Sequence, residues 1–81
     1  MRVTVRFFAI VRDRARMSAL TLELREGAIV RDAIVAIGQK LPDVLALLRR
    51  SAFAVNQQYV SAETKLTDGD ELAVIPPVSG G

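Results

Sequence analysis

The chain contains neither cysteine nor histidine, and these two absences exclude much of the familiar catalytic and metal chemistry. Without cysteine there is no disulfide, no thiol nucleophile and no thiolate ligand for a metal. Without histidine the commonest general base and metal ligand is missing too. The sequence also has no Gly-rich loop followed by Lys and Ser or Thr, so we expect no ATP site, no bound cofactor and no metal.

Long hydrophobic runs and aromatic residues are scarce as well. No apolar run approaches the roughly 18–20 residues that a membrane span needs, and residues 1–6 alternate instead of forming a signal-peptide core. Aromatic residues make up 5% of the chain, and no nucleic-acid-binding motif accompanies its arginines. We therefore expect a cytoplasmic protein that binds neither membranes nor nucleic acid.

The chain does have enough apolar residues to fold. Its 81 residues are 51% hydrophobic, which is typical of one small globular domain. The formal charge of +2 is uneven, because residues 1–16 hold five arginines and one aspartate while the remaining residues balance to −2. A solvated basic face is the favoured interpretation, and an acidic protein partner or a phosphate-bearing ligand is the second.

Alternating segments predict the strands. Residues 2–8 have one apolar face for the core, formed by Val3, Val5 and Phe7, which leaves Phe8 on the outer face. Residues 20–24 place their leucines inward and are expected to pair antiparallel with the first strand. Residues 52–55 and 72–75 predict two more strands, and Tyr59-Val60 adds a short one.

Two helices are expected in the middle of the chain. Residues 30–40 carry apolar side chains at helical spacing, and Ile29 stands where a Ser, Thr or Asp cap is usual. Pro42 ends this helix and opens a second, shorter one over residues 43–50.

Residues 9–16 are a polar stretch of one or two helical turns, in which Ile10 and Val11 are available to pack. The whole order predicts an α+β fold with the first and last strands side by side and parallel. This is the β-grasp, or ubiquitin-like, arrangement, a mixed sheet with one main helix and a second short helix.

The final strand leads into an unusual tail. Pro76 and Pro77 end the sheet, because proline donates no backbone N–H and fixes φ. We therefore divide the chain into a globular domain, residues 1–75, and an extended tail, residues 76–81, which could reach about 20 Å. The tail ends in two glycines, Gly80 and Gly81, so its terminal carboxylate can enter a narrow channel.

Taken together, several segments resemble the small subunit of molybdopterin synthase, the MoaD family of sulfur carriers, and the resemblance covers essentially the whole chain. The segments are Phe7-Phe8-Ala9 with Val11-Arg12, Ala54-Val55-Asn56-Gln57, Leu66-Thr67-Asp68-Gly69-Asp70-Glu71, and Pro76-Pro77-Val78-Ser79-Gly80-Gly81. A terminal Gly-Gly by itself is a weak signal. After a strand and a Pro-Pro pair, in a β-grasp pattern of this length, it is a strong one.

The resemblance implies a chemistry for Gly81. A separate adenylating enzyme of the ubiquitin-activating type uses ATP to adenylate the Gly81 carboxylate. A sulfurtransferase then supplies the sulfur that turns it into a thiocarboxylate. The tail enters the large synthase subunit, in a heterotetramer of two small and two large subunits, and donates sulfur to a pyranopterin precursor of the molybdenum cofactor. The chain is then a sulfur-donating subunit and not itself the catalyst.

Binding to a partner protein needs a contact surface on the globular domain in addition to the tail. Because side chains alternate between the two faces of a strand, Phe8 and Ile75 lie on the solvent side of neighbouring strands. With Tyr59 they form a candidate partner surface near the tail exit. Arg12 is a rim contact in this interpretation. Scattered exposed apolar residues are common, and three near one exit favour an interface.

Other functions remain open from the sequence. A sulfur carrier for thiamin thiazole, cysteine synthesis or tRNA thiolation would share the chemistry. A ubiquitin-like protein modifier would form isopeptide bonds to lysines instead. A β-grasp binding module with an inert tail is the third class.

Overall fold

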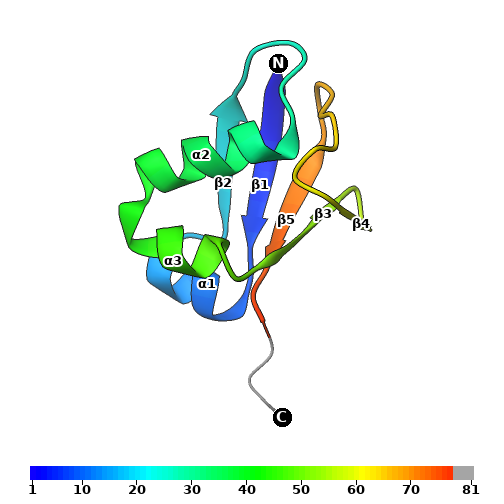
Figure 1. Ribbon diagram of the computed structural model, residues 1–81. Helices are drawn as coiled ribbons and strands as arrows, with labels where there is room; N and C mark the ends of the chain where they lie inside the picture. The colour runs from blue at the N-terminus through cyan, green and yellow to red at the C-terminus, as the bar shows by residue number, and fades with distance from the viewer. Residues whose placement is uncertain (78–81) are drawn as a thin grey trace.

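The computed structural model describes residues 1–77, which form a five-stranded sheet and the helices that pack on it (Figure 1). None of the helices in this described part has the length and apolar character to cross a membrane. The elements, in chain order, are β1 Arg2–Phe7, α1 Ala9–Ala15, β2 Ala19–Glu23, α2 Val30–Lys40, the 3₁₀ turn η1 Pro42–Val44, α3 Leu45–Leu48, β3 Ala52–Val55, β4 Gln58–Val60 and β5 Glu71–Ile75.

The sheet has the order β2-β1-β5-β3-β4. β1 and β5, from opposite ends of the chain, lie side by side and parallel, with Phe7 opposite Val74. β2 is the antiparallel partner of β1, and β3 is antiparallel to both β5 and β4. The predicted β-grasp arrangement is therefore confirmed, including the parallel pairing of the first and last strands.

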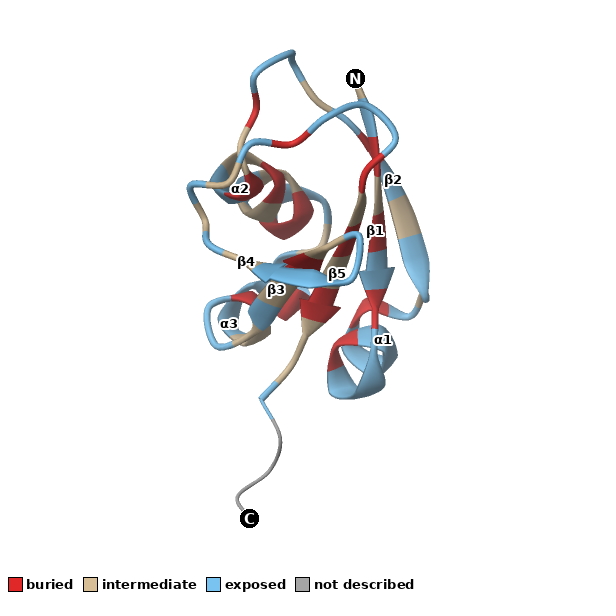
Figure 2. Cartoon of the chain, turned by 90° about the vertical axis from the view of Figure 1, so that its right-hand side faces the viewer, coloured by how far each residue is buried: buried red, intermediate tan, exposed pale blue. Residues whose placement is uncertain are grey.

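The core lies between the sheet and the helices. Figure 2 shows the buried residues along β1, β5 and the inner side of α2. The side chains expected inward from the first and last strands, Val3, Val5, Phe7, Leu72 and Val74, are all buried. They pack in one cluster with Val30, Ala33 and Ile37 of α2. The alternation seen in the sequence thus identifies the covered face of the sheet correctly.

Helix α2 has the predicted bounds, and its unusual start is explained by a neighbouring segment. Ile29 makes no side-chain cap, but its own N–H donates to Asp32 Oδ2 at 2.9 Å. The N–H groups of Val30 and Arg31 donate to the carbonyls of Thr64 and Ala62. The backbone of residues 62–64 therefore supplies the acceptors that a polar cap would have given.

Three local predictions were wrong. The first strand ends at Phe7, and Phe8 precedes the first turn of α1 with an extended backbone. The expected helix over residues 43–50 is a 3₁₀ turn followed by the four-residue α3, because Pro42 opens a tighter turn. Ile10 stays 47% exposed, since α1 buries Val11 and Ala15, one helical turn apart.

A buried aspartate joins the β3–β4 turn to the start of β5. Asp70 accepts hydrogen bonds from Asn56 Nδ2 at 3.0 Å and from the Thr67 N–H at 2.8 Å and hydroxyl at 3.0 Å. Asn56 and Glu71 also bond each other through backbone and side chain. Burial by itself raises the pKa of Asp70, but the bonds from Thr67 and Asn56 outweigh it and hold that pKa below its ordinary value.

The lowered pKa predicts a pH-dependent contribution to stability. A carboxylate with a depressed folded-state pKa stabilises the fold above its unfolded-state pKa, and this contribution is lost as the pH falls through the folded-state value. Asp70→Asn should therefore lower the free energy of unfolding near neutral pH, and the difference from wild type should shrink below about pH 4. Urea titrations across this range measure it. The exposed Asp43→Asn serves as control, and a difference at Asp70 that does not vary with pH would contradict the assignment.

Candidate functional site at the end of the last strand

The chain leaves the sheet at the end of β5, on the side of the molecule where α1 and α3 lie and opposite the N-terminus (Figure 1). β5 ends at Ile75, as the two prolines predict. Pro76 is half-buried and Pro77 is exposed. The remaining predicted tail residues, Val78, Ser79, Gly80 and Gly81, lie outside the described residues. What the structure describes is therefore the base of the tail and its surroundings.

Two neighbouring strands flank this exit. Ala52 of β3 lies opposite Ile75, and on the other side Phe7 of β1 lies opposite Val74. The next residue of β1, Phe8, comes to the level of Ile75 with its side chain 44% exposed. The structure thus brings the predicted interface residues Phe8 and Ile75 together at the base of the tail.

Tyr59 lies on the same face of the sheet but farther from the exit. It pairs with Ala54 across β3 and β4, and Ala54 pairs with Ala73 of β5. Its side chain is 74% exposed on the short edge strand β4. Tyr59 therefore stands two strands from Ile75, roughly 10 Å away across the sheet at the usual strand spacing.

Small residues fill the space between these large ones. Strand register places Ala52, Ala54 and Ala73 on the face that carries Ile75 and Tyr59, away from the core cluster. Together these six residues form what we call the apolar strip, which consists of Phe8, Ala52, Ala54, Tyr59, Ala73 and Ile75. Sequence reasoning missed the alanines, whose signal was their alternation with Phe53, Val55, Leu72 and Val74.

Charged groups border the apolar strip. Arg6 Nε and Glu71 Oε2 form an ion pair at 2.7 Å beside Ala73, and both side chains are half-exposed. The predicted rim residue Arg12 lies on α1, one turn beyond Phe8, and its nearest acidic partner is Asp13 at 4.0 Å. Arg12 is thus exposed near the strip without a close partner among residues 1–77, and it can contact a protein that covers the strip.

A β-grasp sheet with an apolar strip on its open face, in which Phe8, Ala52 and Tyr59 are exposed, Ala73 and Ile75 are half-buried and Ala54 is buried, lies beside the point where the chain leaves in two prolines. This arrangement defines a ubiquitin-like carrier or modifier type of domain. Residues 5–81 match the ThiS family. The chain belongs to this family.

Known proteins resemble this chain in sequence and in fold over its full length. The molybdopterin synthase sulfur carrier subunit of Chlamydomonas reinhardtii is 40% identical, with 100% of each chain covered. Among solved structures, SAMP1 of Haloferax volcanii has a TM-score of 0.93 at 24% identity over 100% of both chains, a likeness of fold. A complex of subunits 1 and 2 of the molybdopterin-converting factor from Helicobacter pylori contains a chain with a TM-score of 0.73 and 28% identity over 100% of both.

Proposed function

We propose that this chain is the sulfur carrier subunit of molybdopterin synthase. The observation that carries the proposal is full-length similarity to a sulfur carrier subunit, on a fold whose last strand ends in Pro76 and Pro77 beside an apolar strip. The tail, residues 76–81, is the working segment in this proposal. The globular part, residues 1–75, positions the tail and binds the protein that receives it.

The reactive group is the carboxylate of Gly81. A carboxylate resists nucleophiles at neutral pH, so it must first receive a good leaving group. The Gly81 carboxylate attacks the α-phosphorus of ATP, pyrophosphate leaves, and an acyl adenylate forms. The outer sulfur of a persulfide donor then attacks the acyl carbon and displaces AMP, which gives an acyl disulfide. A thiol reductant cleaves the S–S bond of this acyl disulfide, becomes oxidised to a disulfide with the donor sulfur, and releases the thiocarboxylate. The ATP belongs to the activating enzyme.

The residues of the tail suit a channel that excludes water. An acyl adenylate hydrolyses if water reaches it, so both partners must enclose the terminus. Glycine at positions 80 and 81 admits the closest approach of a channel wall, because it has no Cβ. Pro76 and Pro77 keep the base of the tail extended and free of the sheet ladder. The tail can thus enter one protein, leave it and enter another.

Three proteins are partners in this proposal. They are an adenylating enzyme of the ubiquitin-activating type, a sulfurtransferase as the sulfur source, and the large subunit of the synthase. The Helicobacter pylori complex of subunits 1 and 2 supports the last of these, since its small chain resembles this one throughout. Two small and two large subunits make the heterotetramer that we propose, and the cytoplasm is the location that we propose for it.

The intact mass of the chain tests the function directly. After incubation with ATP, the activating enzyme and the sulfur donor, we expect the mass to rise by the difference between sulfur and oxygen. Mixing with the large subunit and the pterin precursor should then restore the original mass. A stable thiocarboxylate that only another pathway's acceptor consumes would identify a different sulfur carrier. Gly-Gly remnants on lysines would identify a protein modifier, and an unchanged mass an inert tail.

A further inference from the structure

The charges of this chain are separated between the two ends of the fold. Six of its 11 Lys and Arg residues lie on α1, at the end of α2 and after α3, and only two acidic residues, Asp13 and Asp43, accompany them. We call this group the cationic end; it consists of Arg12, Arg14, Arg16, Lys40, Arg49 and Arg50. With its two acids it carries a net charge of +4, whereas the rest of the chain carries −2.

Ion pairing increases the difference in available positive charge between the cationic end and the rest of the chain. Four of the five other cations form ion pairs, Arg2 with Glu23, Arg6 with Glu71, Arg25 with Asp32 and Arg31 with Glu63. Within residues 1–77 the cationic end has one such contact, the 4.0 Å approach of Arg12 to Asp13. All six cationic side chains are exposed. Positive charge at this end is thus left available to a partner.

The topology places this charge around the base of the tail. β5 lies between β1 and β3, so the chain leaves with α1 on one side and the segment before β3 on the other. Arg49 and Arg50 immediately precede Ser51 and Ala52, and Ala52 is opposite Ile75. Helix α1 begins directly after Phe8 of the apolar strip. The two segments that carry five of the six cations, α1 with Arg16 and residues 49–50, therefore flank the base of the tail, and Lys40 lies beside Arg14 and Arg16.

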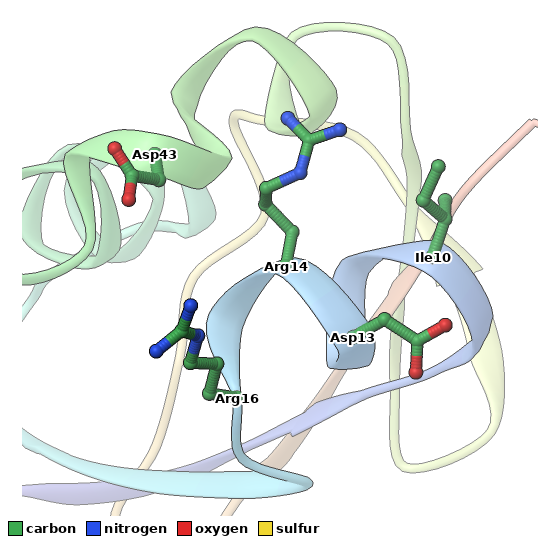
Figure 3. Close-up of a pocket in the computed structure, with 5 residues that line it drawn as sticks. All are labelled: Ile10, Asp13, Arg14, Arg16 and Asp43. Atoms are coloured by element: carbon green, nitrogen blue, oxygen red, sulfur yellow. The ribbon is translucent and has the colours of Figure 1, made fainter.

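The shape of this surface favours an extended partner. A shallow depression of about 420 Å³ lies between α1 and η1, lined by Ile10, Asp13, Arg14, Arg16 and Asp43. Figure 3 shows Arg14 and Arg16 projecting from α1 and its end with their guanidinium groups apart, Arg16 on the side where Asp43 lies, while the Asp13 carboxylate points away from both. The guanidinium groups stand apart instead of meeting at one point, so they suit several carboxylates on a protein surface better than one small anion.

We propose that the cationic end docks on an acidic surface of the large subunit, next to the opening that takes the tail. This inference rests on the proposed function, because it assigns a partner to the same exit. The apolar strip provides the short-range contact, and the cationic end orients the carrier during approach so that the tail points at the opening. Such complementary charge mainly raises the association rate, and salt weakens it.

Charge reversal on both sides of the exit tests the proposal. Arg14→Glu/Arg16→Glu and Arg49→Glu/Arg50→Glu should each slow association with the large subunit at least about tenfold at low salt. At about 0.5 M salt the difference from wild type should nearly vanish. The control Arg25→Glu/Lys65→Glu has the same net charge but alters the far end, where residues 64–66 pack beside the start of α2. It should associate at nearly the wild-type rate, and circular dichroism checks that all three variants fold.

The outcomes separate this inference from the proposed function. Wild-type rates for both exit variants, or equal slowing of the control, would overturn the role of the cationic end and leave the carrier function standing. If the wild-type chain itself does not bind the large subunit, the proposed function fails, and this inference fails with it. Loss of RNA binding by the exit variants, with unchanged binding to the large subunit, would make the cationic end a nucleic-acid surface and also overturn it.

Discussion

Deleting Gly81 is expected to abolish sulfur loading while the melting temperature of the domain stays unchanged. The deletion moves the terminal carboxylate back by one residue, about 3.3–3.6 Å in an extended chain. Acyl transfer requires the reacting atoms to lie within roughly 3–3.5 Å, and misplacement by about 1 Å can cost 10²-fold in rate. The shortened chain should therefore load at least about 10²-fold more slowly, which is no detectable loading in a short reaction. Intact mass after incubation with ATP, the activating enzyme and the sulfur donor measures this.

The expected stability follows from where the core lies. Among residues 1–77 the buried side chains of the core run from Val3 to Val74, and the last strand ends at Ile75. Glycine has no side chain to bury, so we expect the core to keep its packing when Gly81 is removed. Ser79→Ala is the matched control, because it alters the tail but keeps its length and its terminal carboxylate, and it should load normally. A chain without Gly81 that still gains the mass of sulfur would show that another group carries it.

The sequence predicts well those parts of the fold that depend on local periodicity. The bounds of α2 follow from apolar spacing and from Pro42. The inward faces of β1 and β5 follow from strict alternation, because one face of a sheet is buried. Local patterns do not predict which of two similar residues is buried, because packing against other elements decides it. Ile10 and Val11 look alike in sequence, and only the position of Ala15 one turn later decides which is buried.

The candidate site also has a part that local sequence patterns predict and a part that depends on long-range packing. Phe8 and Ile75 could be assigned to the open face by counting along each strand. The alternation of the strip's alanines with larger apolar residues indicates which face they lie on, but it does not indicate a binding site, since alanine has little hydrophobic signal of its own. The cationic end was recognisable only in its N-terminal part, because Arg49 and Arg50 are far from α1 in the sequence. They reach the tail exit only because β5 inserts between β1 and β3.

Phe8→Asp is expected to weaken binding to the large subunit strongly and to leave the fold intact or slightly more stable. Burial of a Phe side chain contributes about 1.5–3 kcal/mol, so its loss should raise the Kd at least about tenfold, and burial of a new carboxylate adds to the loss. The fold tolerates the change because Phe8 precedes α1 in an extended conformation, φ −132° and ψ 154°, with no side-chain cap, and Asp is a favoured residue at such a position.

Titration calorimetry with the large subunit, together with thermal unfolding of the free chain, separates these two effects. Val35→Asp is the matched control for Phe8→Asp, since Val35 is 53% exposed and lies on α2, away from the open face of the sheet. It introduces the same charge at an apolar position that is exposed to a similar degree, and it should bind like wild type. Ile75→Asp should reproduce the loss, because Ile75 and Phe8 directly follow the register partners Val74 and Phe7 at the base of the tail. Wild-type affinity in both Phe8→Asp and Ile75→Asp would mean that the large subunit does not cover the apolar strip. The tail would then have to supply the binding energy, and deletion of residues 76–81 would reduce affinity where these substitutions did not.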